Sequence, residues 1–198
     1  GAIMVSFALV VAMATLVFSF RGSLLGWLDR VLVADVYIAG GSGSRSAIDE
    51  TLITRLQSWP EVAAIGRARQ LEVRYGDDPA AAPVHMQARD LRSALLRPDW
   101  PLLAGAWVAG EGFDEVVYVS EVFAGRFDVV VGDVIELPFV SGRPLRVAGI
   151  FRDYAFQWGQ LLLDLQTYRR ISGDPRIDDL ALIAAGGEVA ALERRAER

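Results

Sequence analysis

The first twenty residues constrain the fold more than any other part of the chain. They read GAIMVSFALVVAMATLVFSF and contain no charged side chain. Their only polar side chains are those of Ser6, Thr15 and Ser19, whose hydroxyl groups can bond to carbonyl oxygens of their own helix. Twenty helical residues span about 30 Å, the thickness of the hydrocarbon core of a bilayer. We therefore expect a transmembrane helix here.

Two other structures could use the same apolar run. A secretory signal peptide would need basic residues before the run and a small-residue cleavage site after it. No basic residue precedes the run, and residues 18–22 (FSFRG) make a poor cleavage site. A buried core helix would normally carry a polar face, which this run lacks. Because the chain opens on Gly rather than Met, we expect it to be part of a longer polypeptide.

The helix is expected to continue outward as a stalk. Five apolar residues fall on one helical face after the run: Leu24, Trp27, Leu28, Val31 and Leu32. Trp27 could lie at the membrane interface, where aromatic side chains gather, or pack against the domain that follows. We therefore assign residues 1–33 to a transmembrane helix and stalk.

Composition argues against several classes of function. The formal charge of −5 and the lack of a basic cluster argue against a nucleic-acid surface. All basic residues are Arg, so this segment has no lysine for a Schiff base or a phosphate loop. The same bias is typical of a GC-rich bacterial genome. There is no Cys, which excludes disulfides, a thiol nucleophile and cysteine metal ligands.

The remaining residues predict an α+β fold. Strand-like patterns occur at residues 35–39, 63–75, 84–88, 116–119, 134–137, 145–150, 160–164 and 179–184. Helical patterns occur at residues 48–59, 122–127, 165–172 and 188–198, and the last helix is expected to run on beyond the chain. Prolines and glycines predict an irregular connection over residues 90–115, anchored to the core by Trp100 and Trp107.

A few polar residues and one glycine have predicted structural roles. Ser46 or Asp49 is expected to cap the first of the predicted domain helices, and Ser120 the second. Gly149 lies inside a predicted strand. A glycine there indicates a bulge or the close approach of another backbone.

The sequence predicts no catalytic, cofactor-binding or metal-binding residue. His85, the single histidine, has no Cys or acidic cluster nearby, so we expect a structural role. The acid pairs Asp77–Asp78 and Asp178–Asp179 fall in predicted turns, where adjacent carboxylates point apart into solvent. The glycine-rich run 40–44 lacks the spacing and the lysine of a phosphate loop. No serine lies in a G-x-S-x-G elbow.

Two features could bind a partner. Arg169 and Arg170 could meet an anionic lipid head group or an acid on a neighbour, although a solvated helix face is the simpler interpretation. Four aromatic residues cluster between two predicted strands: Phe151, Tyr154, Phe156 and Trp158. An exposed cluster would suit a partner or a lipid chain, whereas a buried one belongs to the core, which we favour.

The order of short motifs is more specific than any single motif. The second half contains Val119-Ser120-Glu121, then Ala124 and Arg126-Phe127, then VGDVIEL at 131–137, Gly142, VAGIF at 147–151, Asp153 and 165–168. The first half contains Ser19-Phe20-Arg21, Trp27-Leu28 and ADVYI at 34–38. In this order, the motifs resemble the extracytoplasmic domain of FtsX/MacB-like ABC transporter permeases. The resemblance covers nearly the whole chain.

This resemblance implies a transmembrane and stalk helix followed by a two-lobed extracytoplasmic domain. Residues 34–89 and 176–198 would form a porter-like βαβ lobe, and residues 90–175 an inserted β-rich lobe. Residues after about 30 would face the periplasm or cell exterior from a bacterial inner (cytoplasmic) membrane. Two arginines of the helix flank, Arg21 and Arg30, oppose this orientation, but the positive-inside rule weakens before long translocated domains.

The implied function is mechanical rather than enzymatic. A separate ATP-binding subunit would hydrolyse ATP, and a dimer of permease copies in the lipid bilayer would transmit the motion to the outer domain. That domain would move or extract a lipoprotein, lipid or peptide substrate, or act on an envelope partner. The alternatives are a membrane-anchored envelope hydrolase and a sensor domain. A permease predicts further membrane spans and a neighbouring ATPase gene, an enzyme predicts neither, and a sensor predicts one second span and a cytoplasmic signalling module.

Overall fold

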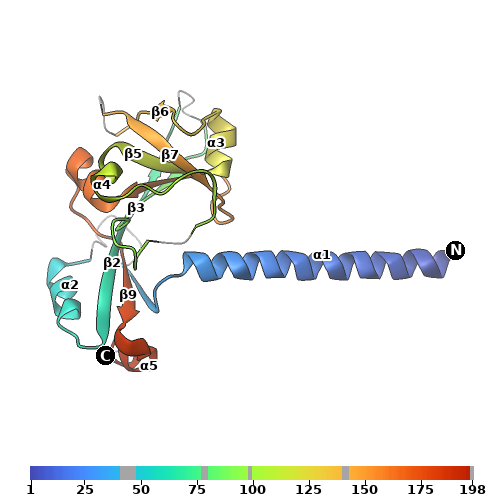
Figure 1. The fold of residues 1–198 in the computed structure, drawn as a ribbon, viewed down its shortest axis with the longest axis horizontal. Helices are drawn as coiled ribbons and strands as arrows, with labels where there is room; N and C mark the ends of the chain where they lie inside the picture. Colours follow the sequence, from blue (N-terminus) through green and yellow to red (C-terminus); the bar gives the residue numbers. More distant parts are fainter. Residues whose placement is uncertain (41–47, 77–79, 98–99, 140–142, 197–198) are drawn as a thin grey trace.

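The computed structural model describes residues 1–40, 48–76, 80–97, 100–139 and 143–196. A long N-terminal helix, α1 (Ala2–Val31), projects as a straight rod from a sheet-based domain (Figure 1). α1 has no break between the apolar run and the predicted stalk. The predicted continuity of run and stalk in one helix is therefore confirmed, while the side chain of Trp27 lies outside the described residues.

The domain alternates strands and helices along the chain. The strands are β1 (Val36–Ala39), β2 (Val62–Val73), β3 (Val84–Arg89), β4 (Leu102–Gly105), β5 (Val116–Ser120), β6 (Val134–Ile135), β7 (Leu145–Phe151), β8 (Gln160–Asp164) and β9 (Asp179–Ala184). The helices are α2 (Glu50–Gln57), α3 (Glu121–Phe127), α4 (Leu165–Ser172) and α5 (Val189–Ala196), with short 3₁₀ helices η1 (Gly110–Glu115) and η2 (Ala185–Gly187). Every predicted strand and helix has a counterpart, which confirms the α+β class.

One continuous sheet contains all these strands. Their order is β1-β9-β2-β3-β8-β5-β7-β4, and β6 pairs with β7. β3 pairs in parallel with β8, and β5 with β7, whereas the other pairs are antiparallel. The β3–β8 pair joins two halves of the sheet. One half contains β1, β9, β2 and β3, and the other contains β8, β5, β7 and β4. The division into two lobes stays a prediction. The strands of the two predicted lobes are hydrogen-bonded to each other in one sheet.

Helices cover one face of this sheet. Ile53 of α2, Phe123 of α3, Tyr168 of α4 and Leu192 of α5 are all buried in a single apolar core. Alternate strand residues face the same core, for example Met86 of β3. This alternation follows from the pleat of a strand, which turns successive side chains to opposite faces.

Connecting segments cover part of the second face. A second, smaller core contains Leu91, Trp100, Phe113, Tyr118 and Phe151. The ring centroids of Trp100 and Phe151 lie 4.5 Å apart, and those of Trp107 and Tyr118 lie 4.4 Å apart. The prediction that both tryptophans anchor the connection over residues 90–115 is therefore confirmed.

That connection is more regular than predicted, because it contains β4 and η1. Gly105 ends β4 with φ of +81°, and a Cβ atom there would lie 2.1 Å from the carbonyl oxygen of Ala148. The glycine that suggested a break instead lets β4 lie against β7. Residues 134–137, in contrast, are less regular than predicted, because the strand there, β6, has only two residues.

The local predictions at the helix starts hold. Ser120 Oγ accepts a hydrogen bond from Phe123 N at 3.3 Å, and Asp49 Oδ1 accepts one from Thr51 N at 3.0 Å. Ser46, the alternative cap, lies outside the described residues. At Gly149 the β5–β7 register shifts, and a Cβ atom would lie 3.1 Å from the ring of Tyr118. Both structures that a glycine at this position indicated, a bulge and a close approach of another residue, therefore occur at Gly149.

Candidate functional site

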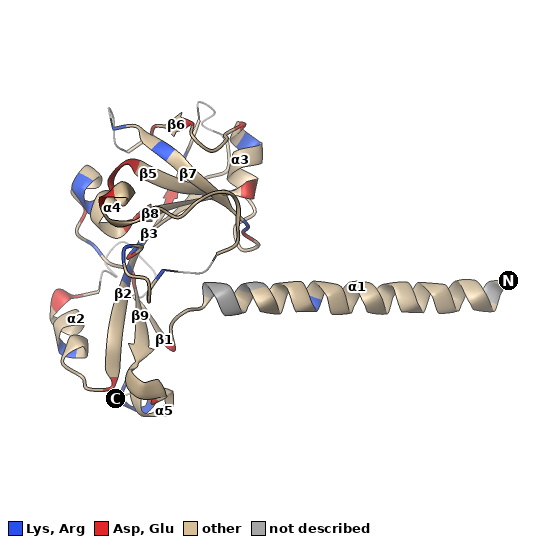
Figure 2. Cartoon of the chain, in the orientation of Figure 1, with Lys and Arg blue, Asp and Glu red and all other residues tan. Residues whose placement is uncertain are grey.

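α1 is the first candidate for a functional element, because it is apolar and uncovered. Within the described residues, Ile3–Gly26 is the one helical span long and apolar enough to cross a membrane, and the domain buries none of it. Thr15 Oγ1 donates to the carbonyl of Val11 at 2.8 Å, so this hydroxyl is satisfied inside the helix. Figure 2 shows the charged residues gathered on the domain and almost none along α1. Such exposure is not that of a core helix.

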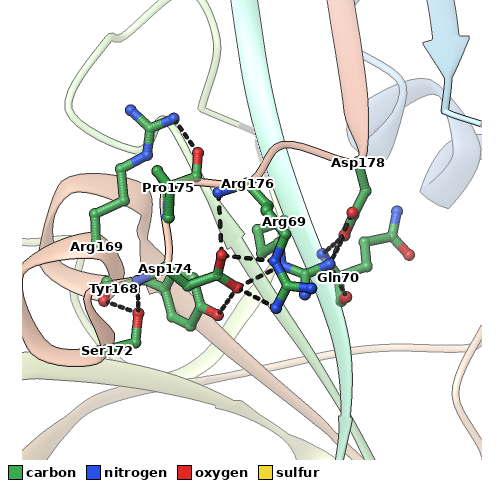
Figure 3. Close-up of polar contacts among 9 residues, drawn as sticks. All are labelled: Arg69, Gln70, Tyr168, Arg169, Ser172, Asp174, Pro175, Arg176 and Asp178. Carbon is green, nitrogen blue, oxygen red and sulfur yellow. Dashed lines mark hydrogen bonds and ion pairs between the residues drawn. The ribbon is translucent and has the colours of Figure 1, made fainter. Parts of the chain in front are cut away.

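The second candidate is a charged network that joins β2 to the connection between α4 and β9 (Figure 3). Arg69 of β2 donates from Nη1 to both carboxylate oxygens of Asp178, at 2.7 and 2.6 Å, and from Nε to Asp174 at 3.0 Å. Asp174 also accepts from the Tyr168 hydroxyl at 2.9 Å and from Arg176 Nε at 2.8 Å. These charge-assisted bonds hold β2, α4 and the start of β9 together.

The bonds also set the charges of this network. Hydrogen bonds from Arg176, helped by those from Tyr168 and Arg69, hold the pKa of Asp174 far below its ordinary value of 3.8. Burial acts to lower the pKa of Arg69, but its bonds to Asp178 and Asp174 raise that pKa overall. Burial raises the pKa of Tyr168, which donates as a neutral phenol. The network is therefore an ionised one at neutral pH.

A further set of charged bonds holds the other side of α4. Arg92 donates from Nε to Asp164 at 2.8 Å and also pairs with Asp114, which accepts from Arg170 Nη1 at 2.8 Å. Asp164 is buried and caps α4 by accepting from Thr167 N at 3.3 Å. Hydrogen bonds from Arg92 and Arg170 lower the pKa of Asp114. α4 is thus tied to η1 and to the connection that follows β3.

The structure corrects the interpretation of Asp178 and Asp179. Asp178 directly precedes β9 and binds Arg69, while Asp179 begins β9 and accepts from the side-chain amide of Gln70. Strand alternation turns the two carboxylates to opposite faces of the sheet, and each meets a partner there rather than solvent. Burial raises the pKa of Asp179. The other pair, 77–78, lies outside the described residues.

Arg169 and Arg170 likewise have partners. Arg169 donates to the carbonyl oxygen of Pro175 at 2.9 Å, and Arg170 pairs with Asp114. Arg169 is half-buried, whereas the side chain of Arg170 is 47% exposed, so the interpretation as a solvated face holds for Arg170 but not for Arg169. The acid that Arg170 meets belongs to this same chain.

His85 lies in a structural environment. The side chain is buried, and its ring stacks on Phe156 with 3.8 Å between centroids. Its Nδ1 lies 3.4 Å from Glu72 Oε1, and burial lowers the pKa of His85, which favours the neutral ring. Nε2 has no hydrogen-bond partner among the described residues. In the same part of the chain, no group of three or more His, Cys, Asp or Glu is placed to hold a metal ion.

The aromatic cluster divides between core and surface. Phe151 is buried in the second core, and Phe156 is half-buried against His85. Tyr154 and Trp158 are 53% and 51% exposed, so the core interpretation is wrong for these two. Phe151 still belongs to β7, whereas the exposed pair lies in the loop that follows.

Sequence reasoning missed the residues that hold the networks together. Arg69 meets Asp174 only when β2 packs beside the connection between α4 and β9, and Arg92 meets Asp114 and Asp164 only when the connection after β3 packs against α4. One signal was available, since Arg69 lies in the middle of a strand. A charged side chain that is partly buried in a sheet needs a partner, so an Arg at that position indicates a distant acid.

Comparisons with known proteins identify the family. A family model described as the MacB-like periplasmic core domain matches residues 1–198. A search of curated proteins finds no matching relative. The solved periplasmic region of MacB from Actinobacillus actinomycetemcomitans is 15% identical, with a TM-score of 0.57 over 86% of this chain and 85% of that one.

A second solved structure has the same fold. The extracellular domain of the ABC-type transporter YknZ from Gram-positive bacteria is 11% identical, with a TM-score of 0.54 over 81% of this chain and 92% of that one. The resemblance that the motif order indicated is confirmed by the family match over the full length. This chain belongs to the family of MacB-like periplasmic core domains.

Proposed function

We propose that this chain is the extracytoplasmic domain of an ABC transporter permease subunit, carried with its first membrane span. The family match over residues 1–198, together with an uncovered apolar helix that leads into the domain, carries the proposal. The domain would lie on the periplasmic or outer side of a bacterial inner membrane. An ATP-binding subunit and a second permease copy would be its partners, as the permease family implies.

The connection between α1 and the sheet suits the transmission of motion. α1 ends at Val31 and β1 begins at Val36, so the link is short. Asp35 in this link is held twice by β9: its N donates to the carbonyl of Leu182 at 3.0 Å, and its Oδ2 accepts from Ala184 N at 2.8 Å. A displacement of α1 would therefore pass into β1 and β9 rather than be absorbed by a slack loop.

The charged networks would keep the displaced domain stiff. Arg69 joins β2 to the start of β9, and Arg92 joins the connection after β3 to the start of α4. In this mechanism ATP hydrolysis on the separate subunit moves α1, and the sheet moves as one body. The domain would then move or extract a lipoprotein, lipid or peptide substrate, or act on an envelope partner, without a catalytic group of its own.

The alternatives have less support. An envelope hydrolase built on His85 would need a nucleophile beside the ring, whereas Glu72 and Phe156 occupy two of its sides. A sensor domain would use the same anchor, but nothing in the charged networks favours signalling over transport.

The proposal is tested by breaking α1 at two glycines and leaving the rest of the helix unchanged. Gly22 and Gly26 lie in α1, and an added Cβ atom at either position meets nothing within 4 Å. Replacing both by Pro should break the helix, whereas replacing both by Ala should leave it intact and is the matched control. Both variants would be made in the full-length permease, assembled with its ATP-binding subunit in nanodiscs.

The readout is the movement of the outer domain. Residues 1–198 contain no Cys, so once any Cys elsewhere in the complex is replaced, Glu50→Cys on the exposed start of α2 gives one spin label per outer domain. ATP should change the label-to-label distance in the parent and in the Ala variant. The Pro variant should still hydrolyse ATP but lose that change. A Pro variant that is correctly inserted and keeps the full ATP-dependent change would contradict transmission through α1.

A further inference from the structure

A pocket of about 330 Å³ opens on the second face of the sheet, beyond the segments that form the second core. Its floor consists mainly of β1, β9, β2 and β3. Its walls come from Asp90, Leu96 and Trp100 and from Asp153, Ala155 and Phe156. Leu32, the residue directly after α1, also lines it. This volume lies at the lower end of the range for small-molecule sites.

Small side chains create the floor of the pocket. Gly66 and Ala68 of β2 are paired with Ala181 and Asp179 of β9, and Ala39 of β1 completes the surface. Larger residues at these inward-turned positions would fill the space. The sheet therefore leaves room here that it does not leave over β5, where every residue is buried.

Arg89 is the charged group that distinguishes this pocket. It stands beside Ala68 in the β2–β3 register and lines the pocket, part-buried. Within the described part of the chain it makes no ion pair, and its one hydrogen bond runs from Nη2 to the carbonyl of Leu96 at 3.5 Å. Burial lowers the pKa of Arg89. A half-buried guanidinium without a paired anion is unfavourable, and no described residue forms an ion pair with Arg89.

The carboxylates that line the same pocket are already engaged. Asp90 accepts from both N and Nε of Arg67, at 2.9 and 3.4 Å. Asp153 accepts from the backbone N of Ala155 and of Phe156, at 2.9 and 3.2 Å. Asp179, the third, accepts from Gln70. None of these three forms an ion pair with Arg89, although the charge of Asp90 favours the charged form of Arg89 from a greater distance.

Two further polar side chains in the pocket also lack partners. The amides of Gln87 and Gln160 line the space, and neither makes a side-chain hydrogen bond with the described residues. Each can donate to an oxyanion beside Arg89. Of the other lining residues, Trp100, Phe156 and Leu96 present apolar surface, whereas Tyr37, Arg67 and Gln70 are polar.

We propose that this pocket binds a small amphiphile that carries one oxyanion, a carboxylate or a phosphate, on an apolar body. Arg89 holds the oxyanion, with Gln87 and Gln160 as further donors, and the apolar body lies against Trp100 and Phe156. A guanidinium forms paired, charge-assisted hydrogen bonds with a carboxylate or a phosphate, and these bonds are stronger than those to a neutral head group. Because Leu32 and β1 line the pocket, a bound ligand touches the point where α1 joins the sheet. The site does not depend on the transport function.

Binding can be tested with matched six-carbon probes and the full chain in phosphatidylcholine nanodiscs. Isothermal titration calorimetry would compare hexanoate and hexyl phosphate with hexanol, which lacks the charge, and with acetate, which lacks the chain. Both anionic probes should bind at least tenfold more tightly than hexanol and than acetate. Hexanol binding as tightly as hexanoate would overturn the role of the oxyanion, and acetate binding as tightly would overturn the role of the apolar wall.

Three variants separate ligand binding from structural roles. Arg89→Gln should weaken hexanoate binding at least tenfold and leave the unfolding temperature of the unliganded protein unchanged or higher, because it removes an unpaired charge. Ala68→Leu should fill the floor and weaken binding with the charge intact. Arg55→Gln, on the exposed face of α2, removes the same charge elsewhere and should bind as the parent does. A marked fall in unfolding temperature for Arg89→Gln, with hexanoate affinity unchanged, would show a structural role and overturn the proposal.

The lipid composition of the disc identifies the source of the ligand. Replacing part of the phosphatidylcholine by phosphatidylglycerol lowers the apparent affinity for hexanoate if an anionic lipid is the natural occupant. Unchanged affinity supports a soluble ligand. Either result presupposes the hexanoate binding that the first experiment measures, and a parent chain that binds neither anionic probe would overturn the proposal.

Discussion

Arg69 and Asp178 lie 109 positions apart in the chain, yet one guanidinium nitrogen of Arg69 is 2.7 and 2.6 Å from the two carboxylate oxygens of Asp178. Their side chains are 11% and 23% exposed, so water screens this pair only partly. The contact joins β2 to the residue directly before β9, which are separated by most of the domain sequence. Removing one partner would leave the other charge poorly solvated, which is costlier than losing an exposed pair.

Replacement of Arg69 by Met should lower the free energy of unfolding by about 2–3 kcal/mol, somewhat less than for a fully buried pair. The physical reason is that Asp174 and Asp178 both lose a donor. Denaturant unfolding of the full chain, followed by tryptophan fluorescence, measures this. Arg176→Met is the control, because Arg176 also binds Asp174 but its side chain is 48% exposed. It should cost less than about 1 kcal/mol, and equal costs for the two variants would contradict the importance of burial.

Acid should destabilise the protein partly through Asp174. Its pKa in the folded protein is lower than the ordinary value of 3.8, chiefly because of Arg176, so the ionised carboxylate stabilises the fold above that ordinary value. This contribution is lost as the pH falls from about 4 towards the lower folded-state pKa. Asp174→Asn should therefore be less stable than the parent at pH 7, and the difference should shrink in acid.

Unfolding free energies of the parent and of Asp174→Asn, measured between about pH 7 and pH 2, test this linkage. The difference between the two curves is the informative quantity, because burial raises the pKa of Asp153 and of Asp179 and makes those groups act in the opposite sense. Curves that run parallel throughout this range would contradict a lowered pKa for Asp174.

Gly105→Ala should disrupt the edge of the sheet. Gly105 has φ of +81°, and the added Cβ would lie 2.1 Å from the Ala148 carbonyl oxygen and 2.7 Å from Gly149 Cα. β4 must then move away from β7, and we expect a loss of about 3–5 kcal/mol in unfolding free energy. Gly110→Ala is the control, since its φ of +55° is also positive but nothing lies within 4 Å of an added Cβ. It should cost about 1–2 kcal/mol, from backbone strain alone. Similar costs for both would show that contact with β7 is unimportant.

Ser120→Ala should cost more than the loss of an ordinary helix cap. Ser120 is fully buried, and its Oγ accepts from Phe123 N at 3.3 Å and from Gln160 N at 2.8 Å. The variant leaves two buried N–H groups without an acceptor, and we expect a loss of about 2–3 kcal/mol in unfolding free energy. Asp49→Ala removes the exposed cap of α2 and should cost about 1 kcal/mol. If urea unfolding gave the same loss for both variants, the bond between Ser120 and β8 would contribute nothing.

Much of the local structure was predictable because local sequence determines it. The apolar run of residues 1–20, the helix over 165–172 and the strand over 179–184 follow from side-chain period and composition. The caps at Asp49 and Ser120 follow from the chemistry of a helix start. β4 was missed because its single partner, β7, lies far along the sequence, and Gly105 reads as a breaker until that partner is in place.

The candidate site was much less predictable. The structural role of His85 was inferred from its lack of suitable neighbours in the sequence and stays a prediction. Asp178 was misinterpreted as pointing into solvent, and the partners of Asp178 and Arg170, which are Arg69 and Asp114, come from other elements. Arg89 directly follows the strand predicted at 84–88, and only the structure shows that Asp90 and Asp179 bind Arg67 and Gln70 rather than Arg89.

The sequence by itself determined the apolar span, the α+β class, most element boundaries and the motif order that indicates the family. Each of these depends on neighbours within a few turns or strands of the chain. The tertiary structure decided which charges meet, since Arg69, Asp174 and Asp178 are brought together by the return of β9 to β2. It also decided that Gly66, Ala68 and Ala181 share a floor beneath Arg89. Ion pairs and pockets depend on distances in space, and pairing between strands far apart in sequence sets those distances.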